Sequence, residues 1–281
     1  MRIDQDAGFR PQQLRGHLLA LVVLAAASLS PVHAETAFQH GGPPPVAEQV
    51  ALLSPASARW QSSLATFAKA DQQHPPASDG VLFVGSSTIR LWSNLSQDFR
   101  QQPVLINRGF GGSTMADCNA LVHELVTQYK PKQILVYAGD NDLAQGQSPA
   151  DVLNSFASFV RNVRTELPGS RIAYISIKPS PSRVSLLPKI RETNALIANY
   201  AQTLTNVRYI DIFSPMLNKD GSPRPELFLS DRLHLNEAGY QLWQSVIVSQ
   251  LPAPLQTREN PVSGVAANPA SASLAPPNTT H

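Results

Sequence analysis

Cysteine is nearly absent from this chain: its 281 residues contain only one, Cys118. A single thiol cannot form a disulfide within the chain, so the fold has to be stabilised by an apolar core. Hydrophobic residues make up 42% of the chain, which is enough for such a core. Cys118 itself falls inside a helical pattern, and this favours a small buried side chain over a nucleophile.

An excess of charge of one sign is also lacking. The chain has 22 Lys and Arg residues against 20 Asp and Glu, a formal net charge of +2. The basic residues form no stripe, so we expect no nucleic-acid partner. The phosphate-binding patterns Gly-x-x-x-x-Gly-Lys-Ser/Thr and Gly-x-Gly-x-x-Gly are missing as well, which argues against a nucleotide site.

The longest apolar run, residues 18–27, is too short to span a bilayer comfortably. It follows a segment with three arginines and precedes Val32-His33-Ala34, a small-x-small pattern typical of a signal-peptide cleavage site. We therefore expect residues 1–34 to be a secretory signal peptide cleaved after Ala34. The mature protein is then periplasmic or secreted, without stable membrane insertion. An uncleaved membrane anchor is the alternative.

Two further segments lack the composition of a folded domain. Residues 35–46 contain Gly41-Gly42-Pro43-Pro44-Pro45, and residues 253–281 are rich in Pro, Ala, Ser, Asn and Thr with few large apolar side chains. Such segments bury too little apolar surface to become ordered. We predict a linker, a disordered tail and, between them, one domain over residues 47–252.

Within this domain, short β-rich runs alternate with helical patterns. Several of these runs are continuously apolar, as in strands that are buried on both faces of a parallel sheet. The alternation predicts an α/β fold, a three-layer α/β/α sandwich around a five-stranded parallel sheet. The strands are expected at residues 81–84, 104–107, 133–138, 171–177 and 207–213, and the helices at about 56–70, 114–129, 149–167, 187–205 and 236–251.

Four of the expected strands lead to polar residues suited to catalysis. The first is followed by Gly85-Ser86-Ser87, the second by residues 107–114, and the third by Gly139-Asp140-Asn141-Asp142. The last leads, after a loop, to Asp231-Arg232-Leu233-His234. Because ligands collect at the carboxyl ends of parallel strands, we expect these four loops to meet at one edge of the sheet.

The residue types in these loops suit nucleophilic catalysis by serine, which needs a base, a group that orients the base, and donors for the oxyanion. Ser86 and Ser87 are both candidate nucleophiles. His234 is a candidate base that Asp231 could orient, and no other histidine lies at this edge. A helix-capping aspartate followed by a surface histidine is the alternative for that pair.

Two further residues are candidate donors for an oxyanion. Asn141 offers a side-chain amide at the end of the middle strand. Gly112 offers a backbone N–H at a position where a bulky side chain would block the approach of a carbonyl group. Together with the N–H of the nucleophile, they would give three hydrogen-bond donors.

This ordered set of motifs resembles the SGNH hydrolases, also called GDSL-type esterases and lipases, over nearly all of residues 80–250. The resemblance implies a flavodoxin-like α/β/α fold, hydrolysis of carboxylic esters and no cofactor. It also implies that Ser87 is the nucleophile, that Asp231 and His234 complete the triad, and that Gly112 and Asn141 join the Ser87 N–H as oxyanion donors.

The chain departs from the family pattern at Ser86. The first motif of the family usually reads Gly-Asp-Ser-Leu, whereas this chain has Gly85-Ser86-Ser87-Thr88. The missing aspartate is not one of the triad residues, so we expect activity to survive. The departure does leave Ser86 as a rival nucleophile.

The segment from Lys178 to Arg183 follows the fourth strand and reaches the same edge of the sheet. One hypothesis is that Lys178 or Arg183 contacts the substrate. The alternative is a solvated loop, because Pro179 and Pro181 favour an irregular connection.

Two other functions are compatible with some of these residues. Asp140, Asp142, Asp231 and His234 offer oxygen and imidazole ligands for a metal ion, but a metal site would leave the serine without a role. A catalytically silent SGNH-like module that binds glycans or assists assembly at the cell envelope is the second alternative. For an active enzyme we expect short acyl esters, above all acetyl esters of small molecules or carbohydrates. The oligomeric state is not encoded in any motif that we recognise.

Overall fold

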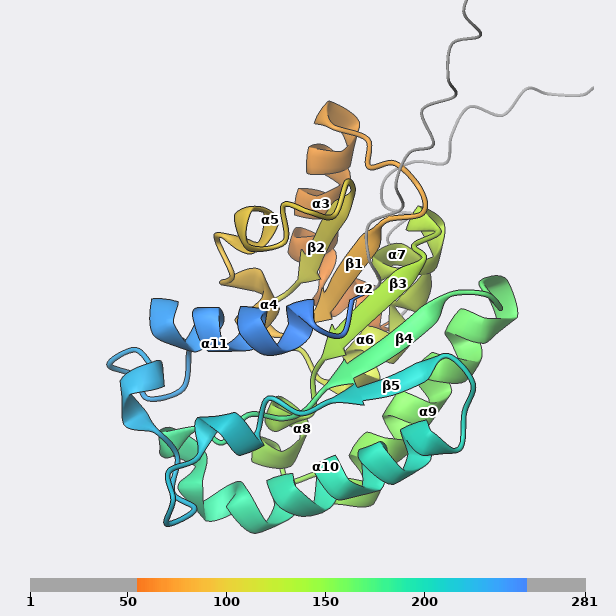
Figure 1. The fold of residues 1–281 in the computed structure, drawn as a ribbon. Helices are drawn as coiled ribbons and strands as arrows, with labels where there is room; N and C mark the ends of the chain where they lie inside the picture. Colours follow the sequence, from red (N-terminus) through yellow and green to blue (C-terminus); the bar gives the residue numbers. More distant parts are fainter. Residues whose placement is uncertain (1–54, 252–281) are drawn as a thin grey trace, which may run out of the picture. The chain divides into compact units, whose positions relative to one another are not determined.

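A computed structural model describes residues 55–251 of the chain (Figure 1). The expected signal peptide (1–34), linker (35–46) and tail (253–281) lie outside the described residues, so these three assignments and the domain limits stay predictions. Among the described residues, no helix has both the length and the apolar character needed to cross a membrane.

Five parallel strands form a single sheet in the order β2-β1-β3-β4-β5, which confirms the predicted fold class. β1 and β3 are buried along their whole length, as their continuous apolar sequences predict. The chain steps from β1 to β2 on one side and then to β3 on the other, so the strand order reverses between β1 and β3. The strands are β1 (Val81–Gly85), β2 (Leu105–Gly109), β3 (Gln133–Tyr137), β4 (Arg171–Ile175) and β5 (Val207–Ile210).

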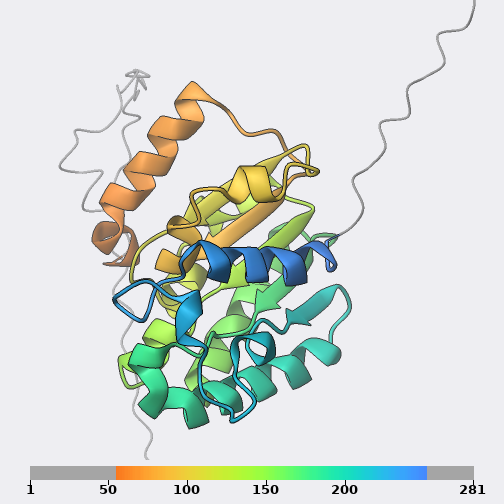
Figure 2. The same ribbon diagram turned by 60° about the vertical axis from the view of Figure 1, so that its left-hand side comes forward.

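Helices pack against both faces of this sheet and make the two outer layers of the sandwich (Figure 1 and Figure 2). The first face packs against α3, α6, α7, α9 and α10, and the second against α4, α5 and α11. The α-helices are α2 (Pro55–Arg59), α3 (Gln61–Gln73), α4 (Ser87–Arg90), α5 (Leu95–Asp98), α6 (Met115–Ala120), α7 (Val122–Leu125), α8 (Asp140–Ala144), α9 (Pro149–Glu166), α10 (Leu187–Gln202) and α11 (Glu237–Val248). Short 3-10 helices lie at η1 (Thr127–Tyr129), η2 (Pro181–Leu186), η3 (Ser214–Met216) and η4 (Pro225–Leu227).

The prediction of one continuous helix over residues 114–129 is wrong. The chain leaves helical geometry at Leu121 (φ −110°, ψ 24°) and at Val126 (φ −134°, ψ −63°), which separates α6, α7 and η1. Both residues are buried together with their neighbours Val122 and Leu125. The apolar pattern therefore continues across the breaks and could not reveal them.

β4 and β5 end earlier than predicted, because side chains replace their inter-strand hydrogen bonds. The N–H and C=O of Ile177 bond to the amide of Asn194, at 2.9 and 3.0 Å. The Ser176 hydroxyl oxygen accepts from the N–H groups of Ile212 and Phe213 at 2.9 and 3.0 Å. Backbone groups that are satisfied by side chains no longer hold the strands together, so the two segments diverge beyond the sheet.

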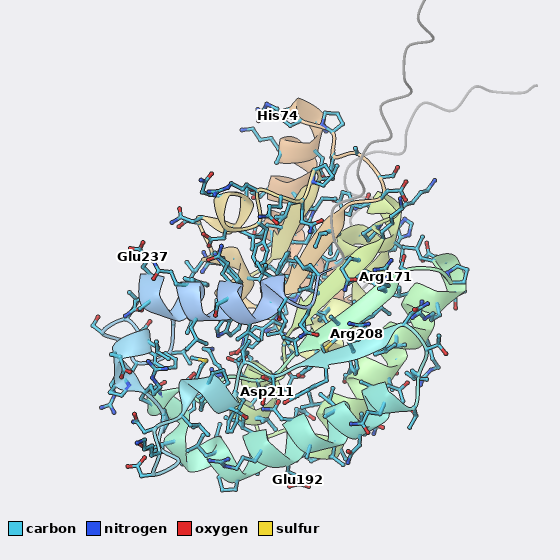
Figure 3. The ribbon with its side chains drawn as sticks, in the orientation of Figure 1. His74, Arg171, Glu192, Arg208, Asp211 and Glu237 are labelled. Carbon is cyan, nitrogen blue, oxygen red and sulfur yellow. The ribbon has the colours of Figure 1, made fainter. Side chains whose placement is uncertain are left out.

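Charged side chains of both signs lie on the outside of this fold (Figure 3). Arg171 and Arg208 are exposed at the start of β4 and β5, whereas Asp211 is exposed just beyond the other end of β5. The thiol of Cys118 is fully buried in α6, as expected. Burial raises the pKa of that thiol well above its ordinary value, so Cys118 remains a neutral part of the core.

Candidate active site

The turn after β1 presents Ser87 as the first residue of α4. This turn requires glycine at position 85, where φ is +142°. A Cβ atom there would lie 1.9 Å from the carbonyl oxygen of Tyr137 on β3. Gly85 thus lets β1 approach β3 closely, and Ser87 emerges beside the point where the strand order reverses, which is where open α/β sheets bind ligands.

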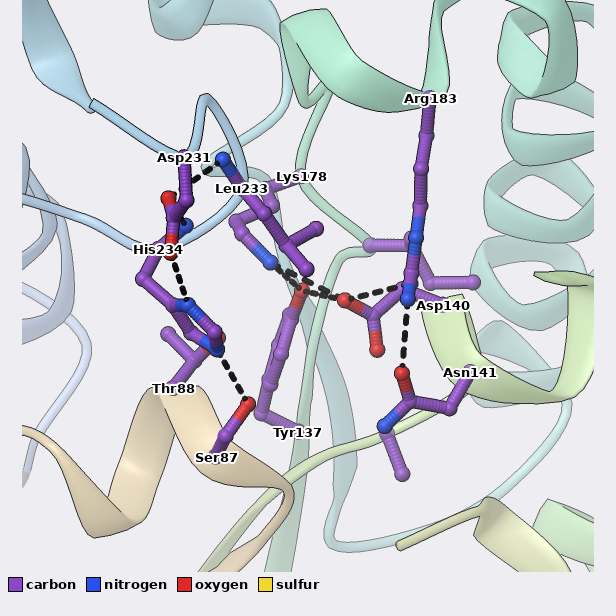
Figure 4. Close-up of polar contacts among 12 residues, drawn as sticks. Ser87, Thr88, Tyr137, Asp140, Asn141, Lys178, Arg183, Asp231, Leu233 and His234 are labelled. Carbon is purple, nitrogen blue, oxygen red and sulfur yellow. Dashed lines mark hydrogen bonds and ion pairs between the residues drawn. The ribbon is translucent and has the colours of Figure 1, made fainter. Parts of the chain in front are cut away.

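Ser87, His234 and Asp231 form a continuous line of hydrogen-bonding groups (Figure 4). Ser87 Oγ lies 2.9 Å from His234 Nε2, and His234 Nδ1 lies 2.6 Å from Asp231 Oδ2. His234 has 24% of its side chain exposed, and Asp231 has 47%. The imidazole is therefore held on both sides and remains open to solvent at one edge.

The loop around Asp231 fixes the orientation of its carboxylate. Oδ1 accepts from the backbone N–H groups of Leu233 and His234, both at 2.9 Å. These bonds, and above all the bond from the His234 side chain, lower the pKa of Asp231 to about 2. The capping alternative for Asp231 is wrong, because Asn236 caps α11 by accepting from the N–H of Gly239.

The two adjacent serines have different surroundings. It is the Ser87 hydroxyl that meets His234. Ser86 is 1% exposed, and its Oγ has no hydrogen-bond partner among the described residues. The backbone N–H of Ser86 donates to Tyr137 O at 3.0 Å, so the residue is held by its main chain. This geometry favours Ser87 over Ser86 as the reactive hydroxyl.

The loop that carries Gly112 follows β2, and the end of β2 is fastened to the helix that bears Ser87. Asn107 Nδ2 donates to Ile89 O in α4 at 2.9 Å, and the Ser113 hydroxyl closes the loop by donating to Phe110 O at 3.0 Å. Gly112 has a φ of +79°, while a Cβ atom there would meet nothing within 4 Å. The backbone conformation rather than a lack of space thus favours glycine at this position.

Asn141 follows β3 and contacts the loop that carries Gly112. A short helix, α8, begins directly after Gly139, and Asn141 lies in its first turn. Asn141 Nδ2 donates one hydrogen bond to Ser113 O at 3.0 Å, so the amide is tied to the residue next to Gly112. The structure therefore brings two of the predicted donors, Gly112 and Asn141, together on adjoining loops.

A buried group of ionic side chains lies beside Asn141, and we call Tyr137, Asp140, Lys178 and Arg183 the Asp140 cluster (Figure 4). Asp140 Oδ2 lies 3.0 Å from Lys178 Nζ, 3.2 Å from Arg183 Nη1 and 3.2 Å from the Tyr137 hydroxyl, which donates to it. Burial opposes ionisation of Asp140, but the charges of Lys178 and Arg183 outweigh it and hold its pKa below the ordinary value.

Lys178 occupies neither of the two environments considered from the sequence. Its side chain is 1% exposed, so the segment is not a solvated loop here and the ammonium group is not open to a substrate. Besides Asp140, it donates to the Tyr137 hydroxyl at 3.0 Å. Arg183 is 16% exposed and donates through Nη2 to Asn141 Oδ1 at 2.9 Å.

The sequence reasoning missed that Asp140, Lys178 and Arg183 are one cluster. The available signal was a lysine placed directly after the buried run Ile175-Ser176-Ile177, because a cation at such a position needs a carboxylate partner. Asp140, at the end of the adjacent strand, was the nearest candidate.

The metal-site alternative requires Asp140 and Asp142 to face His234, and they have other partners. Both oxygens of Asp142 accept from the N–H of Met115, at 3.0 Å, and burial raises the pKa of this carboxyl to about 6. Asp140 is bound within its cluster. Between residues 55 and 251, no group of three or more His, Cys, Asp or Glu side chains is arranged to hold a metal ion.

A comparison with protein families identifies a family for this chain. The model of the GDSL-like Lipase/Acylhydrolase family matches residues 79–242, which include every residue of the site described above. A comparison with curated proteins finds no match.

Several solved structures share the fold. A GDSL-like lipase from Bacteroides thetaiotaomicron has a TM-score of 0.58 and 20% identity, over 66% of this chain and 96% of the other. A lipase/acylhydrolase from Enterococcus faecalis has a TM-score of 0.53 and 19% identity, over 61% and 94%. A variant of an acetyl-xylooligosaccharide esterase from Geobacillus Stearmophilus has a TM-score of 0.52 and 15% identity, over 62% and 94%. At these identities the similarity concerns the fold.

Proposed function

This chain belongs to the GDSL-like lipase/acylhydrolase family, the SGNH hydrolases, and we propose that it is a serine esterase whose nucleophile is Ser87. Membership of the family makes it a hydrolase that acts on ester bonds. The observation that carries the assignment of Ser87 is the unbroken contact from Ser87 through His234 to Asp231, at 2.9 and 2.6 Å.

In the proposed reaction, Ser87 Oγ forms a bond to the ester carbonyl carbon while its proton passes to His234 Nε2. The carbonyl electron pair moves onto oxygen. When it returns, the bond to the alcohol breaks and His234 protonates the leaving alkoxide. A water molecule then repeats both steps on the acylated Ser87. Asp231 stabilises the imidazolium and keeps its Nε2 directed at Ser87.

Three donors are suited to the oxyanion in this proposal. The N–H of Ser87 has no partner within α4, because it belongs to the first residue of the helix. The N–H of Gly112 and the second hydrogen of Asn141 Nδ2 complete the set, since the first hydrogen of that amide bonds to Ser113 O. The loss of one such donor reduces the rate by about 100-fold or more in serine hydrolases.

We propose short acyl groups, acetyl first, as the preferred substrates. A groove of about 290 Å³ is lined by Leu91, four residues after Ser87, and by Leu235, the residue after His234, whereas Ser87 and His234 themselves do not line it. Its other lining residues are largely polar, among them Asn94, Asn236 and Gln241, as suits a small or carbohydrate alcohol group. The acetyl-xylooligosaccharide esterase with a similar fold supports the same choice.

Initial rates on p-nitrophenyl acetate, butyrate and octanoate, and release of acetate from acetylated xylooligosaccharides, test this proposal. We expect the acetyl ester to be preferred, and Ser87→Ala to abolish turnover. Ser86→Ala is the matched control, because it removes the neighbouring hydroxyl and should leave most of the activity. If the wild-type protein hydrolyses no short ester yet binds the oligosaccharides, the chain is a glycan-binding module instead.

We also propose that the protein is exported, from the apolar run 18–27 and the pattern ending at Ala34. Expression of the full chain in a Gram-negative host, followed by fractionation and intact-mass measurement, tests this. A periplasmic or secreted species that begins at Glu35 is the expected result. A full-length species in the membrane fraction would instead indicate a retained anchor.

A further inference from the structure

Asn141 can serve as an oxyanion donor only if its amide faces the right way. The oxygen and nitrogen of an amide are nearly equal in shape, so sterics alone do not choose between the two orientations. In the orientation found here, Nδ2 donates to Ser113 O at 3.0 Å and Oδ1 accepts from Arg183 Nη2 at 2.9 Å. Since a guanidinium group only donates, Arg183 tolerates the amide oxygen opposite it and rejects the amide nitrogen.

The same bond strengthens Asn141 as a donor. A hydrogen bond from a cation to the amide oxygen draws electron density from the amide nitrogen, and bonds in such chains reinforce one another at low dielectric. Arg183 is 16% exposed, so solvent screens this interaction only partly. The polarisation acts on the hydrogens of Nδ2, one of which is left over after the bond to Ser113.

Arg183 is itself held by the Asp140 cluster. Its Nη1 lies 3.2 Å from Asp140 Oδ2, and Asp140 is anchored on its other side by Lys178 at 3.0 Å. Asp140 and Lys178 are 5% and 1% exposed. Two cations share one carboxylate, which leaves one formal positive charge uncompensated within the cluster, next to Asn141.

The segment that carries Arg183 also contacts the loop of the catalytic histidine. The N–H of Ser182 donates to Arg232 O at 3.0 Å, and Arg232 lies between Asp231 and His234 in the sequence. One short segment after β4 therefore bonds to the Asn141 amide at Arg183 and to the histidine loop at Ser182.

We propose that Arg183 is a positioning residue for ester hydrolysis, which fixes the Asn141 amide with its N–H directed at the oxyanion and polarises it. This inference rests on the proposed function, because it requires that Asn141 donates to the oxyanion. It assigns Arg183 a role through Asn141 rather than a direct contact with the substrate.

A double-mutant cycle on p-nitrophenyl acetate hydrolysis tests the inference. The variants are Arg183→Met, Asn141→Ala and the combination of both. We expect Asn141→Ala to lower kcat by about 100-fold. Arg183→Met should lower kcat by at least about tenfold with KM nearly unchanged, as for the loss of a hydrogen bond to a charged group. In the Asn141→Ala background, Arg183→Met should change kcat by less than about twofold, because non-additivity marks residues that act together.

Arg108→Met is the matched control. Arg108 is also a buried arginine bound to an aspartate, Asp71, but it has no contact with Asn141. We expect the kcat of Arg108→Met, per folded molecule, to stay within about twofold of wild type, because residues without shared contacts do not couple. Arg183→Lys keeps a donor and a charge opposite Asp140 and should recover part of the rate. If Arg183→Met does not fold, the cycle is run with Arg183→Lys, whose smaller loss must likewise vanish beside Asn141→Ala.

The outcomes separate this inference from the proposed function. If Asn141→Ala lowers kcat but Arg183→Met costs the same factor in both backgrounds, the positioning role is wrong and the proposed function stands. A rise in KM alone on Arg183→Met would likewise overturn it in favour of substrate contact. If Asn141→Ala has no effect on kcat, the oxyanion assignment fails, and the inference fails with it.

Discussion

Two clusters in this molecule share three kinds of side chain, an aspartate, an arginine and a tyrosine, and the Asp140 cluster adds a lysine. Besides the Asp140 cluster, Asp71 on α3, Arg108 on β2 and Tyr129 on η1 form a group that we call the α3 cluster. Arg108 bonds to Asp71 Oδ1, and the Tyr129 hydroxyl donates to Asp71 Oδ2 at 2.7 Å. The Arg108 guanidinium also lies 4.4 Å from the centre of the Tyr129 ring.

The two clusters differ in what they touch beyond themselves. The α3 cluster pairs one cation with one carboxylate, and its bonds join a helix to the edge strand of the sheet. The Asp140 cluster has two cations for one carboxylate, and one of these cations bonds to Asn141. The same residue types therefore serve to fasten a helix in one place and to direct a side chain of the site in the other.

Removal of each carboxylate should give the largest difference between the clusters. Asp140→Ala leaves two cations, Lys178 and Arg183, without a carboxylate partner in a buried site, and we expect a loss of about 3–5 kcal/mol in the free energy of unfolding. Asp71→Ala should cost about 1–2 kcal/mol, because Asp71 is 24% exposed and Arg108 keeps a bond to Asn107 O at 2.8 Å. Urea unfolding followed by tryptophan fluorescence measures both. An equal or larger loss for Asp71→Ala would contradict the comparison.

The carboxyl of Asp142, two residues after Asp140, should make the free energy of unfolding depend on pH. Burial raises the pKa of Asp142 to about 6, whereas an unfolded aspartate titrates near about 3.9. Between these values the folded state binds more protons, so this group's contribution to stability is present below pH of about 4 and is lost as the pH rises to about 6.

We therefore expect Asp142→Asn to remove a pH-dependent loss of about 2 kcal/mol between pH 4 and 7. Unfolding free energies of the wild type and of Asp142→Asn, measured across that range, should diverge as the pH falls, with the wild type gaining. A constant difference across the range would mean that Asp142 does not titrate there.

The smallest expected difference concerns the two tyrosine hydroxyls. Tyr129→Phe removes one hydrogen bond, to Asp71, and should cost about 1 kcal/mol of stability. Tyr137→Phe removes the bond to Asp140 and the bond from Lys178, and should cost about 1–3 kcal/mol. Only Tyr137→Phe should affect catalysis, by about twofold to threefold in kcat, because Tyr137 reaches Asn141 through Asp140 and Arg183. A change of kcat in Tyr129→Phe would show that the α3 cluster is coupled to the site.

The sequence was sufficient to predict the sheet and the residues that follow its strands. Continuous apolar runs identify β1 and β3, and Ser87 and Asn141 follow the ends of these two strands, where parallel sheets place their sites. His234 lies farther along the chain, in the loop just before α11. Each of these inferences depends on residues that are close in the sequence. That is why they could be made without knowing the packing.

The contacts that the sequence did not predict join residues far apart in the chain. The position of Lys178 after a buried run indicates that its ammonium group needs a carboxylate partner, but Asp140 lies far away in the chain and the flanking prolines suggested an exposed loop instead. The early end of β5 depends on the Ser176 hydroxyl, which belongs to another strand segment. Such contacts follow from the three-dimensional packing and have no local pattern.

Covalent trapping of the nucleophile is the most direct test of the proposed reaction. The full-length protein is treated with an alkyl fluorophosphonate, and the peptide that contains Ser86 and Ser87 is fragmented by mass spectrometry. We expect one adduct on Ser87, with labelling greatly slowed in His234→Ala and unchanged in Arg108→Met. An adduct on Ser86, or none on either serine while ester hydrolysis continues, would contradict the assignment of Ser87 as the nucleophile.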